Sequence, residues 1–222
     1  MGPVTRLSVE GRGLRPSKIL CVARNYPEHA RESGAPVPET PVFFLKPTTA
    51  LLESGGTVLL PPQSRRVDVE GELAIVLGKG GRDVPWEGAM DLVLGYAVIF
   101  DITARDLQAE AKAKGLPWTA AKGFDTFAPI SPVTPAARVG DPDGLSIRVE
   151  VNGGLAQDGN TRDMVHKVPD LIREASRIMR LERGDVLATG TPAGVREIRD
   201  GDVLVGTIER VGRLEVRVSR KV

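Results

Sequence analysis

Short apolar or alternating runs, separated by glycine and proline, are the main pattern along this chain. Valine, isoleucine and leucine dominate these runs, and their length of four to seven residues favours strands over helices. The 25 glycines and 17 prolines provide the turns between them. The pattern predicts strands at residues 18–22, 42–46, 57–60, 95–100, 145–151, 185–188, 202–206 and 214–218.

Helical spacing is clearest over residues 168–179. Five apolar residues there recur at intervals of three or four, which predicts one buried helix face formed by Val168, Leu171, Ile172, Ala175 and Ile178. Shorter helices are predicted at residues 25–32, 86–92 and 105–114. In the first of these, Asn25 could cap the helix and Pro27 could occupy its first turn.

Together these elements predict an α+β fold, a β-rich mixed-sheet arrangement with short helices and not a regular βαβ array. The chain has 222 residues, of which 41% are hydrophobic, so it can bury a substantial core. We expect an N-terminal strand and turn segment over residues 1–16 and one main domain over residues 17–222.

Charge and targeting signals narrow the function classes. The chain has 30 basic and 29 acidic residues, and this balance argues against nucleic-acid binding. No apolar run approaches the roughly 20 residues that span a bilayer, and the start lacks the apolar stretch of a signal peptide. Cys21 is the only cysteine, which fits a reducing compartment. We therefore expect a cytoplasmic protein without nucleic-acid or membrane partners.

Three carboxylates carry the strongest chemical signal. Glu70 and Glu72 lie one residue apart at the start of an apolar strand, so both project to the same face. Asp101 follows the second buried strand. Oxygen donors without cysteine suit magnesium or manganese better than zinc. The alternative is a solvated strand face with Asp101 as a helix cap, and Asp68, on the same face, is a competing ligand.

Two further groups could take part in catalysis. His29 and Glu32 are three residues apart on a predicted helical turn, where a carboxylate could orient the imidazole as a base. An exposed, solvated helix is the alternative. Lys122 lies among small and aromatic residues, where it could face a substrate anion or pair with Asp125.

The turn after the strand at 185–188 could also bind an anion. The hydroxyls of Thr189 and Thr191, with the amide groups around Gly190, could hold an anionic oxygen, although a plain Gly-Pro turn explains the same residues. His166 has no carboxylate nearby and is interpreted as a surface or capping residue.

Six segments in this order resemble the fumarylacetoacetate hydrolase superfamily, from about residue 17 to residue 218. They read CVARNYPEH (21–29), FLKP (44–47), EGELAIVLGK (70–79), DITARDLQ (101–108), KGFDTFAP (122–129) and GDVLATGTP (184–192). The short length and the run KGLPWT (114–119) are most similar to the acylpyruvase and oxaloacetate decarboxylase branch.

The resemblance implies the compact β-rich fold of the family, with residues 17–222 as the catalytic domain, and a homodimer. It implies a magnesium ion, with manganese as a substitute, held by Glu70, Glu72 and Asp101. It also implies three catalytic residues, His29, Glu32 and Lys122. The implied substrate-binding residues are Arg24, Lys46, Arg105, Gln108 and Thr191.

The activity implied is hydrolysis of a C–C bond in 2,4-dioxo acids, such as acetylpyruvate or fumarylpyruvate, to pyruvate and a carboxylic acid. The same site could decarboxylate oxaloacetate. The alternative within the family is an isomerase or decarboxylase of hydroxymuconate-type acids from aromatic catabolism. A metal-stabilised protein that binds oxo acids without turnover is a third possibility, against which the catalytic groups His29, Glu32 and Lys122 argue.

Overall fold

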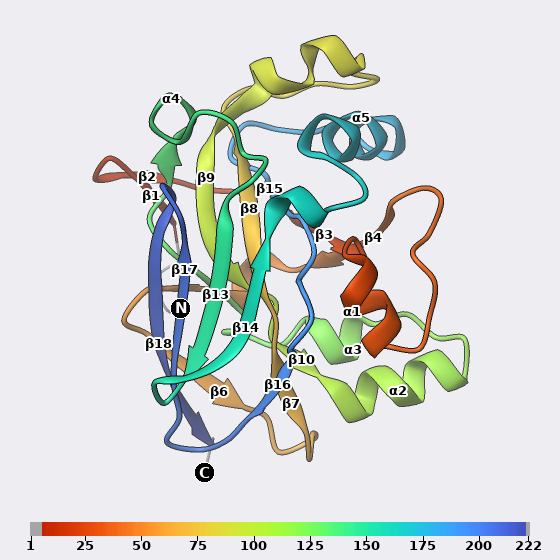
Figure 1. The fold of residues 1–222 in the computed structure, drawn as a ribbon, viewed down its shortest axis with the longest axis vertical. Helices are drawn as coiled ribbons and strands as arrows, with labels where there is room; N and C mark the ends of the chain where they lie inside the picture. The colour runs from red at the N-terminus through yellow and green to blue at the C-terminus, as the bar shows by residue number, and fades with distance from the viewer. Residues whose placement is uncertain (1–5, 221–222) are drawn as a thin grey trace.

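The computed structural model describes residues 6–220, which form a sheet-rich fold with short helices. In Figure 1 the strands fill the body of the molecule, and helices α1, α2 and α3 lie together along one side. The predicted α+β, β-rich class is therefore confirmed. The predicted boundary between residues 16 and 17 stays a prediction, and residues 1–5 of that segment lie outside the described part.

The largest sheet has eight strands, in the order β4-β3-β15-β8-β9-β11-β5, with β12 paired to β9. Strand β15 comes late in the chain but lies between two early strands, parallel to β3 and antiparallel to β8. The bounds are β3 (Ile19–Ala23), β4 (Val42–Lys46), β5 (Leu51–Glu53), β8 (Gly71–Leu77), β9 (Val93–Phe100), β11 (Ala128–Ile130), β12 (Thr134–Pro135) and β15 (Val186–Ala188).

Three smaller sheets complete the strand framework. A five-stranded sheet has the order β14-β13-β17-β18-β6, a three-stranded sheet the order β10-β7-β16, and β1 pairs with β2. Their bounds are β1 (Leu7–Val9), β2 (Arg12–Leu14), β6 (Thr57–Leu60), β7 (Val67–Val69), β10 (Thr103–Ala104), β13 (Ser146–Val151), β14 (Gly154–Asn160), β16 (Arg196–Ile198), β17 (Val203–Ile208) and β18 (Gly212–Arg220).

The helices are short. They are α1 (Pro27–Glu32), α2 (Arg105–Ala113), α3 (Thr119–Lys122), α4 (Ala136–Val139), α5 (Val168–Ile178) and the 3₁₀ helices η1 (Thr48–Ala50), η2 (Trp86–Leu92) and η3 (Thr161–Asp163). Within residues 6–220, none combines the length and the hydrophobicity that crossing a bilayer requires.

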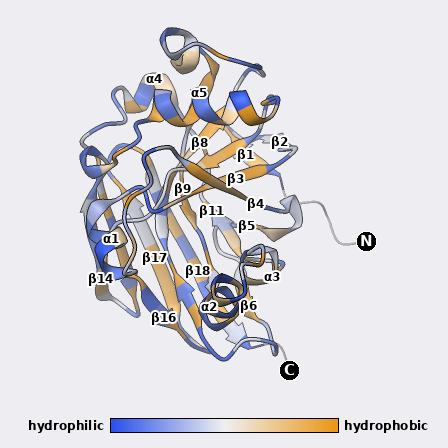
Figure 2. Cartoon of the chain, turned by 90° about the vertical axis from the view of Figure 1, so that its right-hand side faces the viewer, coloured by the Kyte–Doolittle hydropathy of each residue, from blue (hydrophilic) through white to orange (hydrophobic). Residues whose placement is uncertain are grey.

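Strand β8 is buried along its whole length, because the eight-stranded sheet is covered on both faces. Leu73 and Ile75 pack in the core cluster shared with the five-stranded sheet, whereas Ala74 and Val76 pack in the cluster that includes Leu7 of β1. Figure 2 shows hydrophobic residues concentrated along the central strands and a striped pattern on helix α5.

A glycine allows the two sheets to approach next to the predicted metal ligands. A Cβ atom on Gly71 would lie 2.2 Å from Cγ2 of Val149 on β13, which no side chain could tolerate. The Gly71 amide group instead donates to the side chain of Gln157 at 2.8 Å. The residue between Glu70 and Glu72 therefore has to be glycine for this packing.

Most predicted elements are confirmed, with two local corrections. The strands at 42–46 and 57–60 have the predicted bounds, and α5 buries four of its five predicted apolar residues. Ile178 is 57% exposed, because it lies at the end of that helix. Asn25 does not cap α1, which begins after Tyr26 without a side-chain cap, although Pro27 does occupy its first turn.

Candidate active site

The three predicted metal ligands converge. Strands β8 and β9 pair so that Gly71 lies opposite Phe100, and the amide group of Asp101 donates to the Glu70 carbonyl at 2.8 Å. One carboxylate oxygen from each of Glu70, Glu72 and Asp101 lies within 4.8 Å of the others, and all three side chains are buried. The solvated strand face, with Asp101 as a helix cap, is therefore excluded.

Two buried lysines surround Asp101. Lys122 places its Nζ 2.9 Å from Oε2 of Glu70 and 2.5 Å from Oδ2 of Asp101, so it bridges two of the acids. It does not pair with Asp125. Lys46 lies 2.6 Å from Oδ1 of Asp101 and donates to the carbonyls of Ile102 and Lys122 at 2.9 and 2.8 Å. Lys46 thus has its three donors directed at protein oxygens, behind Asp101.

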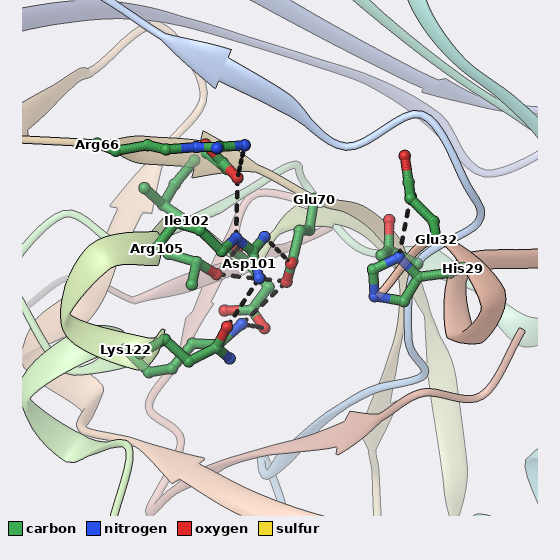
Figure 3. Close-up of polar contacts among 12 residues, drawn as sticks. His29, Glu32, Arg66, Glu70, Asp101, Ile102, Arg105 and Lys122 are labelled. Carbon is green, nitrogen blue, oxygen red and sulfur yellow. Dashed lines mark hydrogen bonds and ion pairs between the residues drawn. The ribbon is translucent and has the colours of Figure 1, made fainter. Parts of the chain in front are cut away.

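Arg105 links the acid cluster to Asp68. Its guanidinium pairs with Glu70, donates from Nε to Oδ2 of Asp68 at 2.8 Å, and donates to Oε1 of Gln108 at 2.8 Å. Figure 3 shows Arg105 and Lys122 converging on Glu70 and Asp101. Asp68 is buried and also pairs with Arg66, so it is not a competing ligand; its charge holds the arginine in place.

Charge is unevenly compensated within the cluster. Burial would raise the pKa of Glu70, but the cations of Lys122 and Arg105 outweigh it and hold that pKa below its usual range. Burial, and next the charges of Asp101 and Glu70, raise the pKa of Glu72 well above its usual range. Among the described residues, Glu72 has no ion-pair partner. Three converging oxygen donors, one of them without a cation, fit a hard divalent metal.

The Gly190 turn supports Glu72. The amide group of Gly190 donates to Oε2 of Glu72 at 2.7 Å. The hydroxyls of Thr189 and Thr191 donate to the carbonyls of Leu73 and Gly71, at 3.0 and 2.9 Å. These groups hold the turn against strand β8, and the turn positions Glu72, a predicted metal ligand. Binding of an anionic oxygen by the turn stays a prediction.

Gln157 and Asn25 secure the turn, and neither was predicted in this role. Gln157 on β14 donates from Nε2 to Oγ1 of Thr191 and to the Pro192 carbonyl, both at 2.8 Å. Asn25 donates from Nδ2 to the carbonyls of Thr189 and His166, at 2.8 and 2.9 Å. These partners are more than thirty residues away in sequence, so no local pattern could indicate them.

The predicted dyad is present at the rim of the site. Nδ1 of His29 lies 3.3 Å from Oε2 of Glu32 on helix α1, which leaves Nε2 as the second functional nitrogen. The His29 side chain is 12% exposed and that of Glu32 41%. Both oxygens of Glu32 also accept from the Gly194 amide group at 3.3 Å. In Figure 3, His29 and Glu32 lie across the opening from Glu70 and Lys122.

One cavity connects most of these groups. The three acids, His29 and Lys122 line it together with the predicted residues Arg24, Arg105, Gln108 and Thr191. Lys46 is not part of its wall, and Glu32 lines a second cavity that adjoins at His29, Ser33, Arg105 and Lys112. Six wall residues were not predicted as site residues: Val22, Ala23, Ser33, Phe44, Lys112 and Trp118.

His166 is partly buried, and its Nε2 lies 3.0 Å from the Pro38 carbonyl in the loop after α1. It therefore contacts the 33–41 loop and does not cap α5, whose N-cap is Lys167.

Comparison with known proteins agrees with this geometry. The family model described as fumarylacetoacetate (FAA) hydrolase, C-terminal, matches residues 18–219. An Arabidopsis thaliana protein named oxaloacetate tautomerase FAHD1, mitochondrial, is 51% identical over 206 residues, covering 93% of this chain and 92% of that protein. The oxaloacetate decarboxylase, mitochondrial, of Dictyostelium discoideum is 47% identical over 188 residues, covering 84% of this chain and 86% of that protein.

A solved structure is similar along the whole chain. The fumarylpyruvate hydrolase of Pseudomonas aeruginosa, in complex with Mn²⁺ and pyruvate, superposes with a TM-score of 0.93 and is 37% identical, covering 100% of this chain and 99% of that chain. The range of the family model includes all six ordered motifs. The chain therefore belongs to the fumarylacetoacetate hydrolase family.

Proposed function

We propose that this chain is a divalent-metal-dependent enzyme that hydrolyses a C–C bond in 2,4-dioxo acids, releasing pyruvate and a carboxylic acid. One observation carries the proposal: three buried carboxylates, an oriented histidine and a buried lysine line the same cavity. A ligand set, a base and a cation for substrate oxygens are the groups that this reaction requires.

Glu70, Glu72 and Asp101 would hold the metal, with magnesium as the expected ion and manganese as a substitute. When bound, the ion would supply Lewis-acid polarisation to the carboxylate and keto oxygens of a 2-oxo acid. Arg105 and Lys122 keep Glu70 ionised, and the Gly190 amide group fixes Glu72. Arg105, Lys122 and Gly190 thereby keep the carboxylate oxygens ionised or in place for a divalent cation.

His29 is the proposed general base. Glu32 engages Nδ1, so Nε2 can accept a proton from a water molecule in the cavity. The resulting hydroxide adds to the C4 carbonyl, the C3–C4 bond breaks, C4 becomes the new carboxylic acid, and C3 takes up a proton to give pyruvate. Lys122 and Gln108 are the proposed donors that stabilise the negative charge on substrate oxygens.

Oxaloacetate is a second proposed substrate. The two relatives described above that carry oxaloacetate in their names are 51% and 47% identical, whereas the fumarylpyruvate hydrolase is 37% identical. Loss of carbon dioxide, or movement of a proton between C3 and the keto oxygen, needs no attacking water. The residues that hold the 2-oxo acid would serve all three reactions, and only hydrolysis would need His29 to activate water.

A substrate panel tests these proposals. The protein is incubated with acetylpyruvate, fumarylpyruvate or oxaloacetate, each with magnesium, manganese or a chelator, and pyruvate is assayed directly. We expect pyruvate with either metal and none with the chelator. The keto and enol forms of oxaloacetate are followed separately by ultraviolet absorbance. Absence of pyruvate from every substrate, with a hydroxymuconate-type acid isomerised instead, would favour the isomerase alternative.

A matched variant tests the assigned base. His29→Asn should lower hydrolysis of acetylpyruvate by about 10²–10⁴-fold, the usual range for general base catalysis. Decarboxylation of oxaloacetate should fall far less, because that reaction uses no water nucleophile. Equal losses in both reactions would contradict the assignment, and thermal unfolding of the variant checks that the fold is intact.

We further propose a homodimer and a cytoplasmic location. The edge strand β4 supports the homodimer, because its Val42 and Leu45 are 41% and 48% exposed and adjoin Leu116, which is 54% exposed. Light scattering at micromolar concentration measures the mass, and Leu45→Glu should shift the population to monomer. A monomeric unmodified protein would end the homodimer proposal.

A further inference from the structure

Two cations at the cavity mouth have no acidic partner. Arg24 and Lys112 both line the cavity, yet neither lies within ion-pair distance of a carboxylate in residues 6–220. The other cations of the wall differ, since Arg105 pairs with Asp68 and Glu70 and Lys122 with Glu70 and Asp101. Nε of Arg24 is also buried without a hydrogen-bond partner.

The backbone at Arg24 is held in an unusual conformation. Its φ is +56°, in the left-handed region that a residue with a side chain rarely adopts. The neighbouring Asn25 keeps the chain there, because its side chain bonds to the backbone of Thr189 and His166, including the His166 amide group at 2.8 Å. The arginine is therefore fixed at the cavity wall by a tightly bonded neighbour.

Lys112 is positioned by an aromatic side chain. Its Nζ lies 5.3 Å from the ring centroid of Trp118, a cation–π contact. Trp118 stacks edge to face on Phe44 with ring centroids 5.6 Å apart, and Phe44 in turn lies 4.9 Å from Nζ of Lys122. Phe44 and Trp118 thus lie between the ammonium group of Lys122, beside the acid cluster, and that of Lys112, at the cavity mouth.

The charges at the mouth repel one another without a ligand. Desolvation, and then the charges of Arg105 and Arg24, lower the pKa of Lys112. Lys112 also lines the adjoining cavity beside His29 and Arg105, so it lies where a molecule extending outwards from the catalytic groups would pass. Like charges kept together beside an apolar surface are typical of a site for an anionic group.

We propose that Arg24 and Lys112 bind a second carboxylate, at the far end of the substrate, with the linking chain lying against Phe44 and Trp118. This inference rests on the proposed function, which places the 2-oxo acid end at Glu70, Glu72 and Asp101. The enzyme then prefers substrates with two carboxylates, such as fumarylpyruvate, over those with a neutral acyl end, such as acetylpyruvate.

The test is the ratio of kcat/KM for fumarylpyruvate to kcat/KM for acetylpyruvate. Lys112→Met and Arg24→Gln should each lower this ratio about 10- to 100-fold, the usual effect of losing a hydrogen bond to a charged group. Lys112→Arg keeps the positive charge and should therefore retain most of the preference for fumarylpyruvate. Lys114→Met is the matched control, because Lys114 is on the same helical segment but pairs with Glu110 at 2.5 Å in solvent; its ratio should be unchanged.

Two outcomes would overturn the inference. The ratio could stay constant in both variants, which includes an equal loss of activity on both substrates, or the control could change the ratio as much as Lys112→Met. A constant ratio leaves the proposed function intact, because pyruvate is still formed by the unmodified protein.

A binding measurement separates the two proposals if turnover fails. Calorimetric titration compares fumarate with crotonate, in which a methyl group replaces one carboxylate. Tighter binding of fumarate, with the difference lost in Lys112→Met, would support the carboxylate site. Equal binding of both acids by the unmodified protein would overturn it.

Discussion

Replacing Lys46 by methionine tests the most deeply buried ion pair of the site. The Lys46 side chain is 0% exposed and that of Asp101 2%, and Nζ also satisfies two backbone carbonyls. Burial lowers the pKa of Lys46 and the charge of Asp101 opposes that shift, so the ammonium depends on its partner. Methionine has a similar volume but leaves Asp101 and both carbonyls without that donor.

The expected loss of unfolding free energy is about 3–5 kcal/mol, the usual cost of removing one partner of a buried ion pair. This is a large fraction of the roughly 5–15 kcal/mol that a domain has. The assay is urea denaturation in the presence of a chelator. The surface variant Lys114→Met breaks a pair whose side chains are 59% and 58% exposed, and should change stability by less than about 1 kcal/mol.

A double variant separates charge from packing. Asp101→Asn combined with Lys46→Met removes a carboxylate that the single variant leaves with Lys122 alone as its cation, so part of the lost stability should return. A loss below about 1 kcal/mol in Lys46→Met would refute the reasoning, since it would mean that Lys122 alone compensates the buried carboxylate of Asp101. A full loss in the double variant would assign the effect to packing and to the carbonyls instead.

Three further predictions concern the metal ligands and the cavity mouth. Without metal, Glu72→Gln should be at least as stable as the unmodified protein at pH 7, because the raised pKa of Glu72 means that its charge destabilises the fold. Added manganese should then not raise the unfolding temperature of this variant. Gly190→Ala should weaken manganese binding in calorimetry, because φ is +92° and the new Cβ would lie 2.9 Å from Cβ of Asn25; unchanged affinity would contradict the role given to the turn. The preference for dicarboxylates should hold at low pH and decline as pH rises through the lowered pKa of Lys112, and a pH profile of Lys112→Arg should lack this decline.

Much of the framework could be predicted from local pattern. Strand alternation places Glu70 and Glu72 on one face, and Asp101 directly follows the next strand of the sheet, so their convergence follows from the pairing of two consecutive strands. Helix α5 has a regular apolar spacing, and four of the five residues predicted to form its core face are buried, while Ile178 is exposed. Short-range periodicity is informative where neighbours in sequence are neighbours in space.

The remaining contacts depend on distant parts of the chain. Asn25 resembles a helix cap in sequence, but partners at residues 166 and 189 take its side chain instead. Asp68 resembles a third ligand on the strand face, until Arg105, 37 residues later, neutralises it. The role of Gln157 depends on how the five-stranded sheet packs on Gly71. Sequence periodicity could not predict these contacts, because they depend on tertiary packing.

The position of strand β15 has a consequence for biosynthesis. This strand is inserted between β3 and β8, and the turn that follows it holds Glu72 through Gly190. A nascent chain of which only the first 180 residues have emerged has all three predicted metal ligands, but it lacks the strand that joins β3 and β4 to β8 and β9. The complete centre can therefore form only after about six-sevenths of the polypeptide has left the ribosome, so co-translational metal capture should be a late event.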